Sequence, residues 1–285
     1  MGMATAIQPK RLRKGGIAVV ALCGALYFVP FLTLFFLITG LFDVLRNERQ
    51  TRDLFERYFS GNGFTTWMLS PLNLALDLTS YPNKKIYSLE DFSPDAREEI
   101  EAVLSVFLAR KQEIIAQVDR SFESGRRAMF LYRWFGRRYN QDIAEFNRPF
   151  KHIQTIAVSV FQGKEATGFH FGPFRATMRV LYNLTPVERD DVFVECGQTR
   201  HYWHQNPLFI FDDTLMHRSV NEHDARRYCV FVDVIRPSPV TGLLCFLLVP
   251  ISTVTHLTKG IFYKHWRMLG ADGAARNRTV TQRPL

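Results

Sequence analysis

Two histidines, each followed by an arginine, are the residues of this 285-residue chain best suited to chemistry. His170 opens the segment His-Phe-Gly-Pro and Arg179 follows it, while His217 is followed at a similar spacing by Arg227. If both histidines stand at strand ends on one rim of a β domain, their neutral imidazoles can hold a ferrous ion. A strand arginine that points into a dry interior needs an anion such as a dicarboxylate, because an unpaired buried charge is costly. The pattern therefore predicts a metal beside a diacid.

The segments around these four residues are strand-like. Short runs rich in β-branched and aromatic residues predict strands at Ile153–Phe161, Thr177–Leu184, Val192–Cys196, Thr199–Trp203, Leu208–Phe211 and Tyr228–Ile235. Gly-Pro, Thr-Pro, Gly-Gln and Asn-Pro pairs separate these runs and mark turns. We therefore expect a jelly-roll core over residues 151–238, because an antiparallel domain that closes on itself protects its edges.

Residues 46–150 are expected to form a helical region that packs on this core, which makes the fold class α+β. Ser93-Pro94-Asp95 supplies helix-start signals, and apolar residues at helical spacing up to Val118 predict one long amphipathic helix. The segment 126–138 interleaves arginines with large apolar residues. Two interpretations stay open for it: a half-buried helix with a solvated basic face, or a patch that binds head-group phosphates.

Two apolar segments predict contact with a membrane. Residues 15–42 carry no charge, so residues 15–45 are expected to be a transmembrane or re-entrant anchor behind a basic tail over residues 1–14. Pro30 can break a helix there, and a re-entrant hairpin keeps both basic flanks on one face. Residues 239–270 are expected to form a second, membrane-associated segment, in which residues 255–269 predict an amphipathic surface helix. Residues 271–285 are expected to be a solvated tail.

Composition narrows the class of partner. The 36 Lys and Arg residues exceed the 27 Asp and Glu residues and give a net charge of +9, which favours anionic partners such as lipid head groups. No zinc-finger or basic-helix pattern is present, so no nucleic-acid partner is expected. The 4 cysteines lack CxxC spacing, which argues against a zinc cluster or a disulfide framework and for a reducing compartment.

The chain resembles the aspartyl/asparaginyl β-hydroxylase family of iron(II)- and 2-oxoglutarate-dependent dioxygenases. The family's His-x-Gly-Pro, downstream Arg, Phe-Asp-Asp, His and final Arg reappear in order between about residues 159 and 237. The resemblance implies that His170 and His217 hold Fe(II) and that Arg227 binds the distal carboxylate of 2-oxoglutarate. It further implies that Arg179 and Ser159 complete the cosubstrate site and that O2 is the second cosubstrate.

The sequence departs from related enzymes at two positions. Leu181 replaces a histidine that contacts the cosubstrate in this family, and Gly172 stands where most dioxygenases of this type place Asp or Glu. Water or a halide could fill that coordination position, and the resemblance favours hydroxylation over halogenation. For Asp212 and Asp213 we expect turn-forming roles and roles in orienting neighbouring ligands. The other histidines are expected to serve packing or surface hydrogen bonding.

The lipid-embedded flanks would hold the rim of the barrel close to a bilayer. We therefore expect the substrate to be a membrane lipid, hydroxylated on a fatty acyl chain at the 2-position, as in bacterial hydroxylases of lipid A or ornithine lipids that the chain resembles. Because 2-oxoglutarate is made in the cytosol, the catalytic domain is expected on the cytoplasmic face of a bacterial inner membrane. The alternatives are a peptide Asp/Asn β-hydroxylase and a non-enzymatic membrane-anchored binding module. The sequence leaves the oligomeric state and the identity of the lipid open.

Overall fold

The computed structural model describes residues 16, 20, 23–24, 27–122, 124–262 and 266–269. Its centre is a β barrel made of two antiparallel sheets whose strands alternate along the chain. One sheet has the central order β4(Ile153–Phe161), β11(Arg227–Ile235), β6(Thr177–Asn183), β9(Leu208–Phe211). The other has the order β5(Glu165–Ala166), β10(His217–Asn221), β7(Val192–Cys196), β8(Thr199–Tyr202). The chain crosses between the sheets at almost every step, so the predicted jelly roll is present.

Four further strands extend the first sheet beyond the jelly roll. β1(Ile86–Tyr87) pairs with β9, and β2(Arg127–Trp134) pairs with β4 and with β3(Arg137–Arg138). β12(Arg267–Leu269) runs parallel to β2. The sheet therefore draws strands from segments on both sides of residues 151–238.

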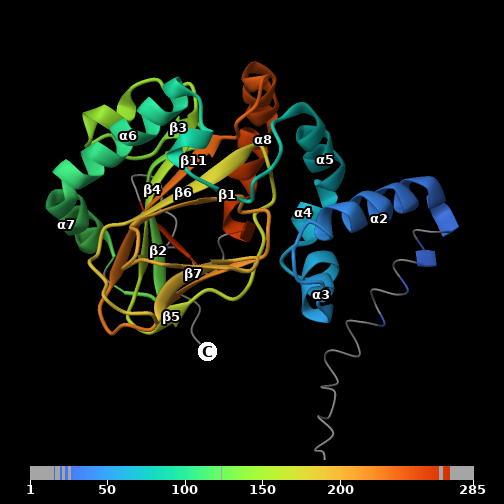
Figure 1. The fold of residues 1–285 in the computed structure, drawn as a ribbon, viewed down its shortest axis with the longest axis horizontal. Helices are drawn as coiled ribbons and strands as arrows, with labels where there is room; N and C mark the ends of the chain where they lie inside the picture. The colour runs from blue at the N-terminus through green and yellow to red at the C-terminus, as the bar shows by residue number, and fades with distance from the viewer. Residues whose placement is uncertain are drawn as a thin grey trace, which may run out of the picture.

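Helices cover two sides of the barrel (Figure 1). α6(Pro94–Ala109) and α7(Lys111–Ser121) lie on one side. On the other side lie α2(Pro30–Val44), α3(Arg52–Ser60), α4(Phe64–Met68) and α5(Ser70–Thr79). α8(Thr241–Phe262) follows the last barrel strand, and the short 3₁₀ turns η1(Leu89–Asp91) and η2(Ala144–Asn147) lie between the larger elements.

Alternation along the strands separates the outer core from the barrel interior. Val158 of β4, Val180 of β6 and Val230 of β11 belong to one apolar cluster with α6 and α7 residues such as Phe107 and Ile114. The intervening residues of these strands point to the opposite face, because successive strand side chains alternate. That face is turned toward the second sheet, where residues of both sheets share another apolar cluster.

Two expectations about the helical region are wrong. The segment 126–138 contains β2 rather than a helix, and most side chains of β2 are buried because the sheet is covered on both faces. The predicted long helix is two helices, which meet at Arg110 with φ −107° and ψ 21°. Apolar spacing runs through both helices, so periodicity alone does not locate the break.

The predicted membrane segments are described only in part. Helix α2 begins at Pro30, where the proline occupies the first turn, and Phe31 is 87% exposed. Within the ranges that the structure describes, no helix is long and apolar enough to cross a bilayer. The tails 1–14 and 271–285 lie outside the described residues. The amphipathic helix expected for residues 255–269 is wrong at its end, because residues 267–269 form β12.

Candidate active site

The structure brings His170 and His217 together. His170 lies in the loop between β5 and β6, and His217 begins β10. The two residues exchange both backbone hydrogen bonds, each with an N to O distance of 2.9 Å. Their ring centroids are 4.1 Å apart. The two histidines therefore meet, although His170 lies in a loop rather than at a strand end, and their role as iron ligands stays a prediction.

The hydrogen bonds of the two rings define which ring nitrogen can bind a metal. His170 Nδ1 lies 2.9 Å from the carbonyl oxygen of Gly168, and His217 Nδ1 lies 2.9 Å from that of Leu215. A carbonyl oxygen can only accept, so each Nδ1 carries the proton and each Nε2 carries a lone pair. Burial lowers the pKa of His170 to about 4 and the pKa of His217 well below 6.5. Both rings are therefore uncharged at neutral pH, and each has an Nε2 lone pair that a metal ion could bind.

Gly172 leaves room for the carboxylate of Asp213. The Gly172 N–H donates to the Asp213 carbonyl at 2.6 Å, and a Cβ added to Gly172 would lie 2.4 Å from Asp213 Cγ. Any larger residue at 172 would therefore displace the Asp213 side chain. No group of three or more His, Cys, Asp or Glu side chains within the described ranges is arranged to hold a metal. Iron binding by this histidine pair therefore stays a prediction.

Arg227 is a buried cation without an anionic partner in the part of the chain that the structure describes. Its Nη2 donates to Ser219 Oγ at 2.6 Å, whereas Nε and Nη1 have no hydrogen-bond partner. The guanidinium carbon lies 4.5 Å from the Phe161 ring centroid and 5.6 Å from that of Trp203. Burial lowers the pKa of Arg227. Trp203 Nε1, also buried, lacks a partner as well, so several N–H donors are available to an anion.

Ser159 stands on the same strand face as Arg227. Ser159 pairs with Cys229 across β4 and β11, and Arg227 pairs with Phe161 two residues further along. Directly opposed residues share a face of a sheet, so Ser159 and Arg227 both face the barrel interior. The Ser159 hydroxyl donates to the Cys229 carbonyl at 3.2 Å. The cosubstrate roles expected for both residues stay predictions.

Arg179 is engaged by two buried carboxylates. Its Nε lies 2.7 Å from Asp233 Oδ1, and its Nη2 lies 2.7 Å from Asp213 Oδ2. The guanidinium carbon also lies 3.7 Å from the centroid of the Phe231 ring. Arg179 thus neutralises charges inside the barrel, and its expected contact with a cosubstrate stays a prediction. Leu181, on the same face of β6, packs among the apolar residues between the sheets.

Asp212 and Asp213 occupy the turn that precedes His217, as expected. Asp212 accepts from the backbone N–H of Thr214 at 2.9 Å, which is the hydrogen bond of a turn-forming aspartate. Its carboxylate also accepts from Arg46 Nη2 at 2.6 Å. Burial raises the pKa of Asp213, while the Arg179 guanidinium beside it acts in the opposite direction.

Several residues around the site were missed by sequence reasoning. Trp203 and Ser219 contact Arg227, and Asp233 contacts Arg179. Asp233 had a usable signal, because it is the one acidic residue inside the apolar strand at 228–235. Trp203 and Ser219 had no such signal, because a Trp or Ser in a strand is ordinary.

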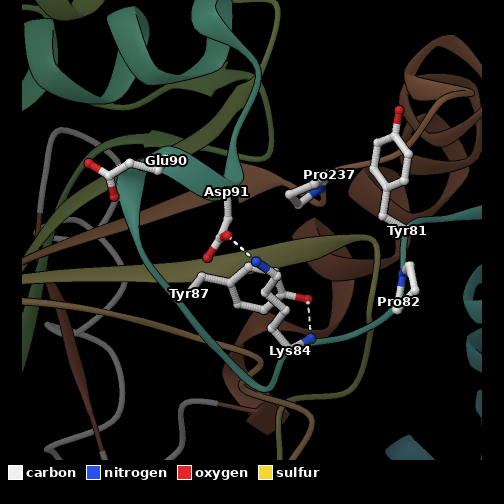
Figure 2. Close-up of a pocket in the computed structure, with 7 residues that line it drawn as sticks. All are labelled: Tyr81, Pro82, Lys84, Tyr87, Glu90, Asp91 and Pro237. Carbon is white, nitrogen blue, oxygen red and sulfur yellow. Dashed lines mark hydrogen bonds and ion pairs between the residues drawn. The ribbon is translucent and has the colours of Figure 1, made fainter.

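A pocket of about 270 Å³ opens elsewhere on the surface (Figure 2). Its lining includes Lys84, which forms an ion pair with Asp91 and whose backbone N–H donates to the Tyr87 hydroxyl at 3.3 Å. Neither histidine lines this pocket, nor do the three residues predicted to bind the cosubstrate. The pocket is therefore distinct from the candidate site.

Comparison with known proteins gives three kinds of match. The family model described as aspartyl/asparaginyl beta-hydroxylase matches residues 94–237. The chain is 26% identical over 158 residues to an ornithine lipid ester-linked acyl 2-hydroxylase of Rhizobium tropici. That match covers 52% of this chain and 56% of the relative, so the chain spans little more than half the length of the curated relative.

Solved structures match smaller parts of the chain. A prolyl hydroxylase from Trichoplax adhaerens in complex with a peptide fragment is 19% identical, with 29% of this chain and 44% of that chain covered and a TM-score of 0.24. A cupin barrel protein from Salinispora arenicola is 13% identical, with 36% and 71% covered and a TM-score of 0.24. The strand order, rather than these partial likenesses, makes the barrel a jelly roll.

Proposed function

The chain belongs to the aspartyl/asparaginyl β-hydroxylase family, and we propose that it is an Fe(II)- and 2-oxoglutarate-dependent hydroxylase of a membrane lipid. One observation carries this proposal. Two neutral histidines present their Nε2 lone pairs in the same barrel that buries an arginine with no anionic partner among the described residues. A metal and a diacid would satisfy these groups together.

His170 and His217 would hold the iron through Nε2. Their Nδ1–H groups are fixed by backbone carbonyls, which keeps both rings in the ligating tautomer before a metal arrives. When bound, iron and 2-oxoglutarate with O2 supply an oxidant that can hydroxylate an unactivated carbon. The protein contributes the ring orientation and a site within the barrel.

Arg227 would bind the distal carboxylate of 2-oxoglutarate. Its Nε and Nη1 have no hydrogen-bond partner and can each donate to a carboxylate oxygen, and the Phe161 and Trp203 rings limit its movement. Ser159 is on the same face and has a hydroxyl that can turn toward the ligand. Arg179 is proposed to complete the site by holding Asp213 and Asp233 in place beside the cosubstrate.

A membrane lipid is proposed as the substrate, with hydroxylation of an acyl chain at the 2-position. The acyl 2-hydroxylase named above supports this class of substrate. Helix α2 adds support, because its exposed side chains include Phe31, Phe35 and Ile38. The net charge of +9 suits anionic head groups.

We place the protein at a bacterial inner membrane with its barrel on the cytoplasmic side, where 2-oxoglutarate is made.

The experiment follows the product directly. The full chain, with Fe(II), 2-oxoglutarate and O2, is incubated with ornithine lipid or lipid A in mixed micelles, and lipids and succinate are measured by mass spectrometry. We expect a gain of one oxygen on an acyl chain and stoichiometric succinate, both absent for His170→Ala. Succinate formed only with an Asp- or Asn-containing peptide would contradict the lipid substrate. No succinate with any substrate, and no uptake of ferrous ion, would leave the binding module as the correct description.

A further inference from the structure

The helical segment 43–73 contains an unusual group of buried polar side chains. Among the described residues 27–122, the buried polar or charged residues are Asp43, Asn47, Thr66, Ser70 and Asn73. Burying such groups in helices is unfavourable unless each finds a partner. Ser70 bonds to Thr39 within the helical layer, whereas the other four reach the histidine-bearing turns or the arginine between them.

The first turn, residues 169–173, carries His170 and is held through its carbonyl oxygens. Three side chains of the helical segment donate to it: Asn62 Nδ2 to Phe169 O at 2.7 Å, Thr66 Oγ1 to Gly172 O at 3.0 Å, and Asn73 Nδ2 to Pro173 O at 3.2 Å. Thr66 and Asn73 have no exposed surface. These carbonyl groups therefore depend on the helices for their hydrogen bonds.

The second turn, residues 212–216, precedes His217 and is held by the start of the same segment. The Met216 backbone N–H donates to Asn47 Oδ1 at 2.9 Å. Arg46 donates to Asp212 Oδ2 at 2.6 Å and to Thr214 Oγ1 at 3.3 Å. Both histidine turns are thus attached to one helical unit.

Arg175 connects the two turns inside the molecule. It follows the first turn, is fully buried, and donates from Nε to Thr214 Oγ1 of the second turn at 3.1 Å. Its other donors form ion pairs with Asp43 of α2 and with Asp77 of α5. Asp43 also accepts from the Tyr58 hydroxyl at 2.5 Å. The opposite charges of this cluster neutralise one another, so Arg175 can link the two turns while it stays buried away from solvent.

Apolar packing follows the same arrangement. Phe171, next to His170, belongs to a cluster with Val44, Leu54 and Tyr58, and Met216, next to His217, packs against that cluster. The Phe171 and Tyr58 rings meet edge to face, with centroids 5.5 Å apart. The neighbours of both histidines therefore pack on α2 and α3.

We propose that residues 43–73 act as a positioning clamp, which holds the two histidine turns at the separation that iron binding needs. The proposal rests on the proposed function. It also explains how two histidines suffice without a carboxylate at Gly172, because fixed turns replace the orientation that a third protein ligand would provide. Helix α2 and the predicted iron centre then move as one body.

The test removes one clamp hydrogen bond without changing side-chain shape. Thr66→Val deletes the donor to Gly172 O, Thr66→Ser keeps it, and Thr79→Val is the matched control, because the Thr79 hydroxyl bonds only within α5. Iron affinity is measured anaerobically by chelator competition, and folding by circular dichroism and thermal unfolding. We expect Thr66→Val to weaken Fe(II) binding by about 10-fold or more. Thr66→Ser and Thr79→Val should stay within about twofold of wild type.

A second variant decides the outcome if Thr66→Val does not fold. Asn62 is exposed and donates to Phe169 O, so Asn62→Ala removes a clamp contact without disturbing the core. We expect it to weaken iron binding several-fold. Iron affinities equal to that of Thr79→Val in every folded variant would overturn the clamp while leaving the proposed function intact. A wild-type chain that binds no ferrous ion would instead overturn the proposed function.

Discussion

At the scale of single residues, Arg227 is the side chain whose surroundings say most about a ligand. Its guanidinium lies between two aromatic rings, and two of its nitrogens have no partner in the described residues. A protein that holds an uncompensated buried charge is less stable than one in which the charge is absent or paired. The same arginine should therefore oppose folding without a diacid and favour it with one.

Arg227→Met is expected to raise the free energy of unfolding of the cosubstrate-free protein by roughly 1 to 3 kcal/mol. When both proteins are already loaded with Fe(II), adding 2-oxoglutarate should raise the melting temperature of the wild type and leave that of the variant nearly unchanged. Thermal unfolding of both proteins, with and without the diacid, checks this. A wild type that is more stable than Arg227→Met without any diacid would show that Arg227 has a structural partner.

The histidine pair predicts a pH dependence of stability. Burial lowers the pKa of His170 to about 4 from its ordinary value of 6.5, so between these values the unfolded chain binds a proton that the folded chain does not. Stability of the metal-free protein should therefore fall as pH decreases through this window, by at most about 1.4 kcal/mol per pH unit for each histidine. Urea unfolding at several pH values should show a shallower slope for His170→Asn. Equal slopes would mean that His170 titrates normally.

At the level of secondary structure, strands were predicted correctly where β-branched and aromatic residues form a continuous run. The runs at 153–161, 192–196 and 208–211 coincide with β4, β7 and β9, because β-branched and aromatic residues fill them. β10 was missed because its sequence His-Arg-Ser-Val-Asn has no apolar alternation. The helical interpretation of the segment that contains β2 was wrong, because arginines interleave with its large apolar residues and no period of two is visible; head-group binding by these arginines stays a prediction.

The two histidines were found because their spacing to an arginine is local, whereas the clamp could not be found. Its residues lie about 100 to 170 positions from the turns that they hold. Asn47, Thr66 and Asn73 also resemble ordinary surface residues in the sequence. Long-range polar contacts of this kind leave no periodic signal, so only the folded arrangement reveals them.

Leu131 offers a test of strand β2. Leu131 and its neighbour Tyr132 are each 1% exposed, although they point to opposite faces of the sheet. Leu131→Ala should lower the free energy of unfolding by about 2 to 4 kcal/mol. Arg138→Ala, at an exposed position of β3, should change it by less than about 0.5 kcal/mol. Chemical denaturation measures both, and a small effect at Leu131 would argue against a strand covered on both faces.

At the scale of the whole molecule, the helices on the two sides of the barrel differ in what they expose. α2 presents large apolar side chains, including Phe31 and Phe35, while α6 packs its apolar residues on the sheet. The site lies between the sheets, and the clamp joins it to α2. A membrane that binds α2 would therefore hold the barrel at a fixed position relative to the lipid.

Replacing Phe31 and Phe35 together by glutamate should reduce binding to anionic vesicles by at least about 10-fold, because the variant loses apolar area and gains two charges. Iron affinity should stay at the wild-type level, because neither side chain belongs to the clamp. Leu108→Glu, at a half-exposed position of α6, is the control and should bind vesicles normally. Vesicle co-sedimentation measures the binding. Equal losses for both variants would indicate a non-specific charge effect.

The most direct measurement is the binding of ferrous ion and 2-oxoglutarate to the purified full chain under anaerobic conditions, followed by visible absorption and metal analysis. We expect one iron per chain and an absorption band that appears only when both iron and 2-oxoglutarate are present. His170→Ala and His217→Ala should lose the iron, and Arg227→Met should keep the iron but lose the diacid-dependent band. A folded wild-type chain that takes up no iron, or histidine variants that bind it as tightly as wild type, would show that His170 and His217 do not form an iron site.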